Sequence, residues 1–204
     1  MISYFLVRFF QRQDEEMQFQ LTLNGILLAA VTEGLLFMGY LGTMQGEGEL
    51  EAILKSLLTA VYWNMTAWID LLTGCVYVLV NRLVFLISCI LLLRDGQVSI
   101  LGCLSFLFFW FFAILCERKG AFGKGDSEFL MVSYCLFEAI PGTKHHLEWM
   151  LLMMFFSSVF FGIFRKLAGR KEESIPYTPF LVFSEYIILI LLVLLPEKEV
   201  YGTI

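Results

Sequence analysis

The sequence predicts an all-α protein, a polytopic bundle of about seven transmembrane helices with a cytoplasmic N-terminus. Three observations lead to this fold class. The chain of 204 residues is 59 % hydrophobic and 16 % charged, whereas a soluble domain averages about 45–50 % apolar and about 25 % charged residues. Apolar stretches near the length of a membrane-spanning helix recur along the chain. Basic residues gather on one side of the topology that these stretches define.

Seven apolar stretches are the expected spans, and short loops connect them. The first contains Glu33. The second and third are separated at Thr73-Gly74, because residues 56–93 are too long for one crossing and this pair favours a turn. The fourth is the least interrupted, and the fifth is the shortest. In order, the spans are Leu21–Gly42, Ala52–Ile69, Cys75–Leu93, Val98–Cys116, Ser127–Ile140, Leu147–Phe164 and Tyr177–Leu195.

The distribution of Lys and Arg predicts which side of the membrane each loop occupies. With the N-terminus in the cytoplasm, ten of the 14 basic residues fall at the inner face and four at the outer face, as the positive-inside rule requires. The inner group is Arg8, Arg12, Arg82, Arg118, Lys119, Lys124, Arg165, Lys166, Arg170 and Lys171, and the outer group is Lys55, Arg94, Lys144 and Lys198.

Residues 1–51 are expected to hold an amphipathic segment on the cytoplasmic surface and the first transmembrane helix, and residues 52–204 a six-helix core. No cleavable signal peptide is expected, since the apolar start lacks a preceding basic region and a small-residue cleavage site. The net charge of −5 argues against nucleic acid as a partner. The five cysteines form no C-x-x-C pair, so they are interpreted as packing residues rather than as a zinc site or a disulfide framework.

Two aspartates stand out because ionisable groups at apolar helices are costly and often functional. Asp70 ends the second span and Asp126 opens the fifth, and two spans separate them. An even number of crossings places both carboxylates at the same face of the membrane, where they are able to meet. Two apposed carboxyl groups in a low-dielectric site tend to share one proton. Such a pair combines a general base with a general acid.

A glycine-containing turn precedes the second aspartate in the run Gly123-Lys124-Gly125-Asp126. Glycine permits positive φ and a close approach of a ligand to the backbone. Asp126 is also placed to cap the helix that follows. Taken alone, this turn favours an ordinary loop that ends in a helix cap. Its pairing with Asp70 favours a functional site.

These residues resemble the intramembrane aspartyl proteases of the type IV prepilin peptidase family. The segment Gly123–Asp126 matches the G-x-G-D motif of that group, which also includes preflagellin peptidases and, more distantly, presenilins. The segment Ala67–Leu71, followed by Thr73, resembles the apolar helix that ends in the first aspartate motif. Downstream, Ile175–Phe180 resembles the Ile-Pro-x-x-Pro-Phe that opens the last helix of the family.

The resemblance implies an aspartic endopeptidase of the bacterial cytoplasmic membrane. Asp70 and Asp126 would be the catalytic pair, and Gly123 and Gly125 would give the substrate backbone room to approach. The substrate would be a type IV prepilin or pseudopilin, cut between its basic leader and its apolar helix at the inner face by a water held between the aspartates. No metal or cofactor is implied. The chain lacks the paired C-x-x-C motifs of the methyltransferase region that bifunctional members carry.

Two positions depart from the family pattern. Val76-Tyr77-Val78 occupies the stretch where the family has Pro-Asn or Pro-Asp. Glu128 replaces a Lys two residues after the second aspartate, and this carboxylate either raises the pKa of Asp126 or points away from it.

Two alternatives to a protease stay open. One is a non-catalytic membrane component of a pilus or secretion assembly system. The other is a small transporter that relays protons through its carboxylates, although such carboxylates are expected near the bilayer midplane. Glu33, Glu138 and Glu185 are the remaining carboxylates in the spans, and His145-His146 with Glu148 is interpreted as an ordinary outer loop rather than a metal site.

Overall fold

The computed structural model of the chain describes residues 2–3, 5–7, 23–43, 49–74, 76–96, 98–119, 123–138, 146–168 and 176–194. Within these ranges the regular elements are helices and no strand occurs, which confirms the all-α prediction. Residues 2–3 and 5–7 belong to a short helical segment. The longer helices are α2 (Leu23–Thr43), α3 (Glu49–Thr73), α4 (Val78–Arg94), α5 (Ile100–Arg118), α6 (Lys124–Glu138), α7 (His146–Ala168) and α8 (Thr178–Leu194).

Each of these seven helices coincides with one expected span to within a few residues. By length and composition, however, the described residues contain one stretch that is both long and apolar enough to cross a membrane, Met150–Leu167 in α7. Leu27–Gly39 in α2 and Thr178–Ile188 in α8 are apolar but shorter. The seven helices are therefore established as helices, and the seven-span topology stays a prediction.

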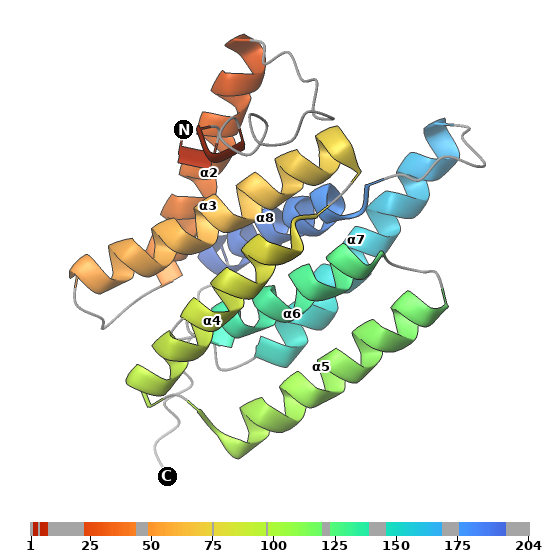
Figure 1. The fold of residues 1–204 in the computed structure, drawn as a ribbon. Coiled ribbons are helices and arrows are strands. Elements are labelled where there is room, and N and C mark those ends of the chain that lie inside the picture. Colours follow the sequence, from red (N-terminus) through yellow and green to blue (C-terminus); the bar gives the residue numbers. More distant parts are fainter. Residues whose placement is uncertain are drawn as a thin grey trace.

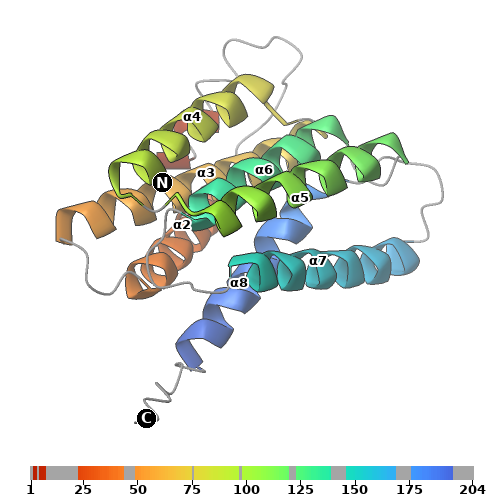
Figure 2. The ribbon, with the colours of Figure 1, turned by 90° about the horizontal axis from the view of Figure 1, so that it is seen from below.

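The helices pack in two groups that share an interface. Helix α6 lies between α4 and α5 and contacts both of them (Figure 1). Helix α8 contacts α2, α3 and α7, and α2 also packs on α3. Seen from below, α7 lies on the opposite side of the bundle from α4 (Figure 2). The ends of α3, α6 and α8 meet where the two groups join, and this is where the candidate site lies.

Aromatic side chains hold α6 against α3. The ring of Phe129 stacks on Tyr62 with 5.5 Å between ring centroids and meets the edge of Trp63 at 5.1 Å. All three side chains are buried. Aromatic pairs at these separations add to the stabilisation that comes from burying their apolar area. They therefore set the position of α6, and with it Asp126, relative to α3.

The N-terminal segment packs on α2 and α3 through a buried polar network. The backbone N–H of Ser3 donates to the carboxylate of Glu33 at 3.0 Å, and the Asn64 side chain donates to the Ser3 hydroxyl oxygen at 3.0 Å. Val7 joins Met65 and other residues of α3 in a small apolar cluster. The expected division between residues 51 and 52 falls within the first turn of α3, which begins at Glu49. The structure thus continues one helix across that boundary.

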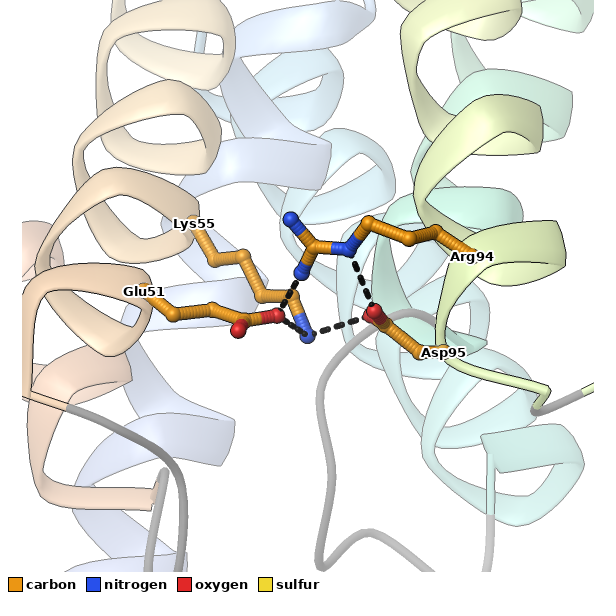
Figure 3. A network of polar contacts seen from close by, with 4 residues as sticks. All are labelled: Glu51, Lys55, Arg94 and Asp95. Atoms are coloured by element: carbon orange, nitrogen blue, oxygen red, sulfur yellow. Dashed lines mark hydrogen bonds and ion pairs between the residues drawn. The ribbon is translucent and has the colours of Figure 1, made fainter.

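An ion-pair network joins the start of α3 to the end of α4 (Figure 3). The ammonium of Lys55 lies 2.8 Å from Oδ2 of Asp95 and 3.3 Å from Oε1 of Glu51. Arg94 contacts Glu51 as well, and its Nε donates to Oδ1 of Asp95 at 2.8 Å. The side chain of Lys55 is 4 % exposed, so this buried ammonium depends on its carboxylate partners. The network lies at the opposite end of α3 from Asp70.

Candidate active site at the ends of helices α3, α6 and α8

Asp70 lies in the last turn of α3, and its side chain is buried at 3 % exposure. The helix ends at Thr73, and Gly74 follows with φ +64°. The N–H of Gly74 donates to the carbonyl oxygen of Asp70 at 2.7 Å, as in a helix C-terminus closed by a left-handed glycine. This confirms the predicted turn at Thr73-Gly74 and the place of Asp70 just before it.

Asp126 lies in the first turn of α6, which begins at Lys124. Its Oδ2 accepts a hydrogen bond from the backbone N–H of Gly123 at 3.1 Å, and the Ser127 N–H donates to the Gly123 carbonyl at 3.1 Å. Asp126 therefore stabilises the start of the helix, as expected, but from its third position. A side chain at this position reaches back to the N–H of the capping residue, as in a capping box.

The glycines of the Gly123–Asp126 turn do not adopt positive φ. Among the described residues, positive φ occurs at Gly74 and Gly96, so the conformational reason expected for Gly123 and Gly125 is wrong. The structure supplies a different reason for Gly125. A Cβ at this position would lie 2.7 Å from Cβ of Val76, which is closer than packed carbon atoms approach. Gly125 is thus needed for the contact between the first turn of α6 and the connection from α3 to α4, which contains Val76.

Thr178, the first residue of α8, connects the two aspartates. Its backbone N–H donates to Oδ2 of Asp70 at 2.9 Å. Its hydroxyl donates to Oδ1 of Asp126 at 2.8 Å. The residue is fully buried. The structure therefore brings Asp70 and Asp126 to one place, as the sequence predicts, with a threonine that contacts both.

Thr178 lies within the Ile175–Phe180 motif, but its local sequence did not predict a role in the site. The local signal was a hydroxyl side chain just before a proline at the start of an apolar helix, which is common to many helix starts. Its partners become visible only when α8 is placed against α3 and α6.

Tyr177 anchors the start of α8 to α7. Its hydroxyl lies 2.7 Å from the hydroxyl of Ser157 and 3.3 Å from that of Ser158. Its ring meets Phe161 edge-on at 5.4 Å. These contacts hold the residue that precedes Thr178, so the donors of Thr178 are presented from a rigid support.

Burial and mutual repulsion set the protonation of the pair. Asp70 follows the expected span Ala52–Ile69 and Asp126 precedes the expected span Ser127–Ile140. Burial, together with the charge of Asp126, raises the pKa of Asp70 to about 6, against the lowering effect of hydrogen bonds from Thr178 and Tyr177. Burial also raises the pKa of Asp126, opposed by the hydrogen bonds from Thr178 and Gly123. A pair of this kind titrates as a unit.

Glu128 lies within electrostatic range of Tyr62 in α3. Its carboxylate acts electrostatically on Tyr62, whose hydroxyl donates to Oδ1 of Asn81 at 2.9 Å. The pKa of Asp126 is shifted by burial, Thr178 and Gly123. These causes favour the alternative in which Glu128 does not raise the pKa of Asp126.

The other carboxylates of the apolar helices lie outside the site. Glu33 and Glu185 are buried, and Glu33 belongs to the network with Ser3 described above. Glu138 lines an apolar cavity of about 440 Å³ between α4, α5 and α6 and packs against Gly102. Among the residues that the structure describes, no group of three or more His, Cys, Asp or Glu is arranged to hold a metal ion. The side chains of His145, His146 and Glu148 fall outside the described residues.

Comparison of the chain with protein-family models, curated proteins and solved structures found no match.

Proposed function

We propose that this protein is an intramembrane aspartic endopeptidase that removes the leader peptide of type IV prepilin or pseudopilin substrates. The cut would be made at the inner face of the bacterial cytoplasmic membrane. One observation carries the proposal: Asp70 and Asp126, from different helices, accept hydrogen bonds from the same buried residue, Thr178. Asp70 is buried and Asp126 is half-buried, and paired carboxylates shielded from water are the arrangement that aspartic peptidases use to activate a water molecule.

The placement of the site agrees with the predicted topology. The end of α3 and the starts of α6 and α8 are all expected at the inner face, and these are the elements that supply Asp70, Asp126 and Thr178. Large apolar side chains are exposed along α5, among them Leu104, Phe108 and Phe111. Exposed apolar area of this kind is suited to contact with lipid or a partner, which supports a protein embedded in a bilayer.

The proposed reaction uses one ionised and one protonated carboxyl group. The ionised aspartate accepts a proton from a water as the water oxygen bonds to the scissile carbonyl carbon. The protonated aspartate donates its proton to the carbonyl oxygen, which gives a neutral gem-diol. The C–N bond then breaks, the leaving nitrogen takes a proton from the first aspartate, and a diol hydroxyl returns its proton to the second. Each carboxyl group is thereby restored for the next cycle.

The test is processing of a prepilin co-expressed with the wild-type protein or with Asp70→Asn or Asp126→Asn. The wild type is expected to convert the precursor to a shorter mature form, and each substitution is expected to abolish the conversion. Asp95→Asn, which alters an aspartate in the distant network of Figure 3, is the matched control and should preserve processing. The mature N-terminus is then located by mass spectrometry. Processing that continues in both site variants would refute the proposal.

The second candidate is a non-catalytic membrane component of a pilus or secretion assembly system. One observation favours it: Glu128 stands where the resembled family has a Lys. This candidate predicts a folded protein that cuts no prepilin. Its deletion should still impair pilus assembly or secretion. Expression of Asp70→Asn in the deletion strain should then restore assembly or secretion as fully as the wild type does.

A further inference from the structure

We propose that Thr178 is a positioning residue that sets the relative placement of the two aspartates. It contacts each of them through a different group, the backbone N–H toward Asp70 and the side-chain hydroxyl toward Asp126. The inference rests on the proposed function for its catalytic consequence. It rests on the hydrogen bonds themselves for the placement.

Backbone N–H groups at the start of α8 face Asp70, that of Thr178 at 2.9 Å, with a further contribution from Tyr177. The N–H of Phe180 donates to the carbonyl of Tyr177 at 3.0 Å, and Pro179 has no N–H. The N–H of Thr178 therefore points out of the helix, as the first N–H groups of any helix do. A carboxylate at this end also interacts favourably with the helix dipole. Asp70 is thus tied to the start of α8 through backbone N–H groups, which remain when the side chain at position 178 is changed.

The contact to Asp126 depends on the side chain. A threonine hydroxyl either donates or accepts a hydrogen bond, whereas an N–H only donates. Oδ2 of Asp70 must therefore remain an acceptor throughout the reaction. Oδ1 of Asp126 keeps its contact whether or not it carries a proton, because the Thr178 hydroxyl turns to accept. The same residue thus holds the pair together in both of its protonation states.

Removal of the hydroxyl has a distinct chemical signature. Thr178→Val keeps the shape of the side chain and the N–H toward Asp70. It removes the hydroxyl, which donates to ionised Asp126 and also acts on Asp70. Loss of a hydrogen bond to the charged form makes ionisation harder. Tyr177 is a further titratable group within electrostatic range of Asp126, and it is unchanged in this variant. The acidic limb of the pH profile of kcat should move to higher pH by roughly 0.5–1 pH unit, which is the equivalent of one net hydrogen bond.

The experiment compares the wild type, Thr178→Val and Thr178→Ser in purified, detergent-solubilised form with a prepilin substrate. Thr178→Val should lower kcat by about 100-fold, the scale of a misplaced reacting group, with KM little changed. Thr178→Ser should restore most of the activity and the wild-type pH profile. Thr59→Val is the matched control, because its buried hydroxyl donates within its own helix to the Lys55 carbonyl at 2.9 Å. It should leave kcat and the pH profile unchanged.

Two results would overturn the inference. One is a Thr178→Val variant with wild-type kcat and pH profile. The other is an equal loss in Thr178→Val and Thr178→Ser without a change in the profile, which would show a packing role. Loss of cleavage in Asp70→Asn and Asp126→Asn separates either result from a failure of the proposed function.

A second measurement tests the placement without any substrate. The pH midpoint of the Asp126 carboxyl is followed by its infrared band, assigned by subtraction of the Asp126→Asn spectrum. Thr178→Val should raise this midpoint, and Thr59→Val should not. An unchanged midpoint in Thr178→Val would overturn the inference whether or not the wild type cleaves a prepilin.

Discussion

Asp70→Asn is expected to stabilise the folded protein at pH 8 and to change its stability little at pH 4. Burial and the charge of Asp126 raise the pKa of Asp70 from 3.8 to about 6. A carboxyl group with a raised folded-state pKa holds its proton more tightly when the chain is folded. Its ionisation therefore costs stability, beginning as pH rises through the unfolded-state value and reaching the full cost above the folded-state value.

The structure sets the size of this effect. The rise from 3.8 to about 6 corresponds to about 3 kcal/mol, at about 1.36 kcal/mol for each tenfold change in the ionisation constant. Asparagine keeps an acceptor for the Thr178 N–H but adds two amide hydrogens that need partners, which costs part of the gain. A net stabilisation of about 1–2 kcal/mol at pH 8 should raise the Tm by roughly 2–8 °C for a chain of this length.

Asp95→Asn is the matched control and is expected to act in the opposite direction. Burial alone would raise the pKa of Asp95, but hydrogen bonds and charges from Lys55 and Arg94 hold it below its usual value. A carboxylate with a lowered pKa contributes stability at neutral pH, and this contribution is lost as pH falls through the folded-state value. The substitution also leaves the buried Lys55 ammonium without a charged partner at 2.8 Å. Asp95→Asn should therefore destabilise the protein at pH 8 and less so at pH 4.

The assay is thermal unfolding in detergent micelles at pH 8 and pH 4, followed by the fluorescence of the four tryptophans. The wild type, Asp70→Asn, Asp95→Asn and the double variant are compared under the same conditions. The two sites lie at opposite ends of α3, so their effects should add in the double variant. A lower Tm of Asp70→Asn at pH 8, or Tm shifts of the two single substitutions in the same direction, would contradict the opposite pKa shifts of Asp70 and Asp95.

The glycines provide two further predictions. Gly125→Ala places a Cβ 2.7 Å from Cβ of Val76 and should cost about 1–3 kcal/mol by overpacking. A double-mutant cycle with Val76→Gly should show coupling between the two positions, and strictly additive changes in unfolding free energy would count against the contact. Gly74→Ala, at φ +64°, should destabilise by about 1–2 kcal/mol. Gly162→Ala, in α7 with open space around it, should instead stabilise the protein by about 0.5–1 kcal/mol. Equal Tm shifts for Gly74→Ala and Gly162→Ala would refute the predicted cost of positive φ at position 74.

Elements that depend on local chain properties were predictable from the sequence. The seven long helices follow from apolar stretches of helical length. The break at Thr73-Gly74 follows from the preference of glycine for the left-handed conformation, which Gly74 adopts with φ +64°. Asp70 and Asp126 were identifiable because carboxyl groups beside long apolar helices are costly to bury.

Features that depend on which helix meets which were not predictable. The role of Thr178 requires α8 to reach both α3 and α6, and nothing in its own neighbourhood reveals either partner. Gly125 was expected to provide an unusual backbone conformation, but it is needed for the close approach of Val76. The electrostatic interaction of Glu128 with Tyr62 was left open by the sequence for the same reason.

The sequence by itself thus determined the helices, their order and the two candidate carboxylates, because apolar length, turn preference and the cost of burying charge are properties of short segments. The tertiary structure alone decided how the two carboxylates are held, that Thr178 links them and that Glu128 lies within electrostatic range of Tyr62. Hydrogen bonds between residues far apart in the chain depend on how rigid helices pack, and that packing is a property of the whole bundle.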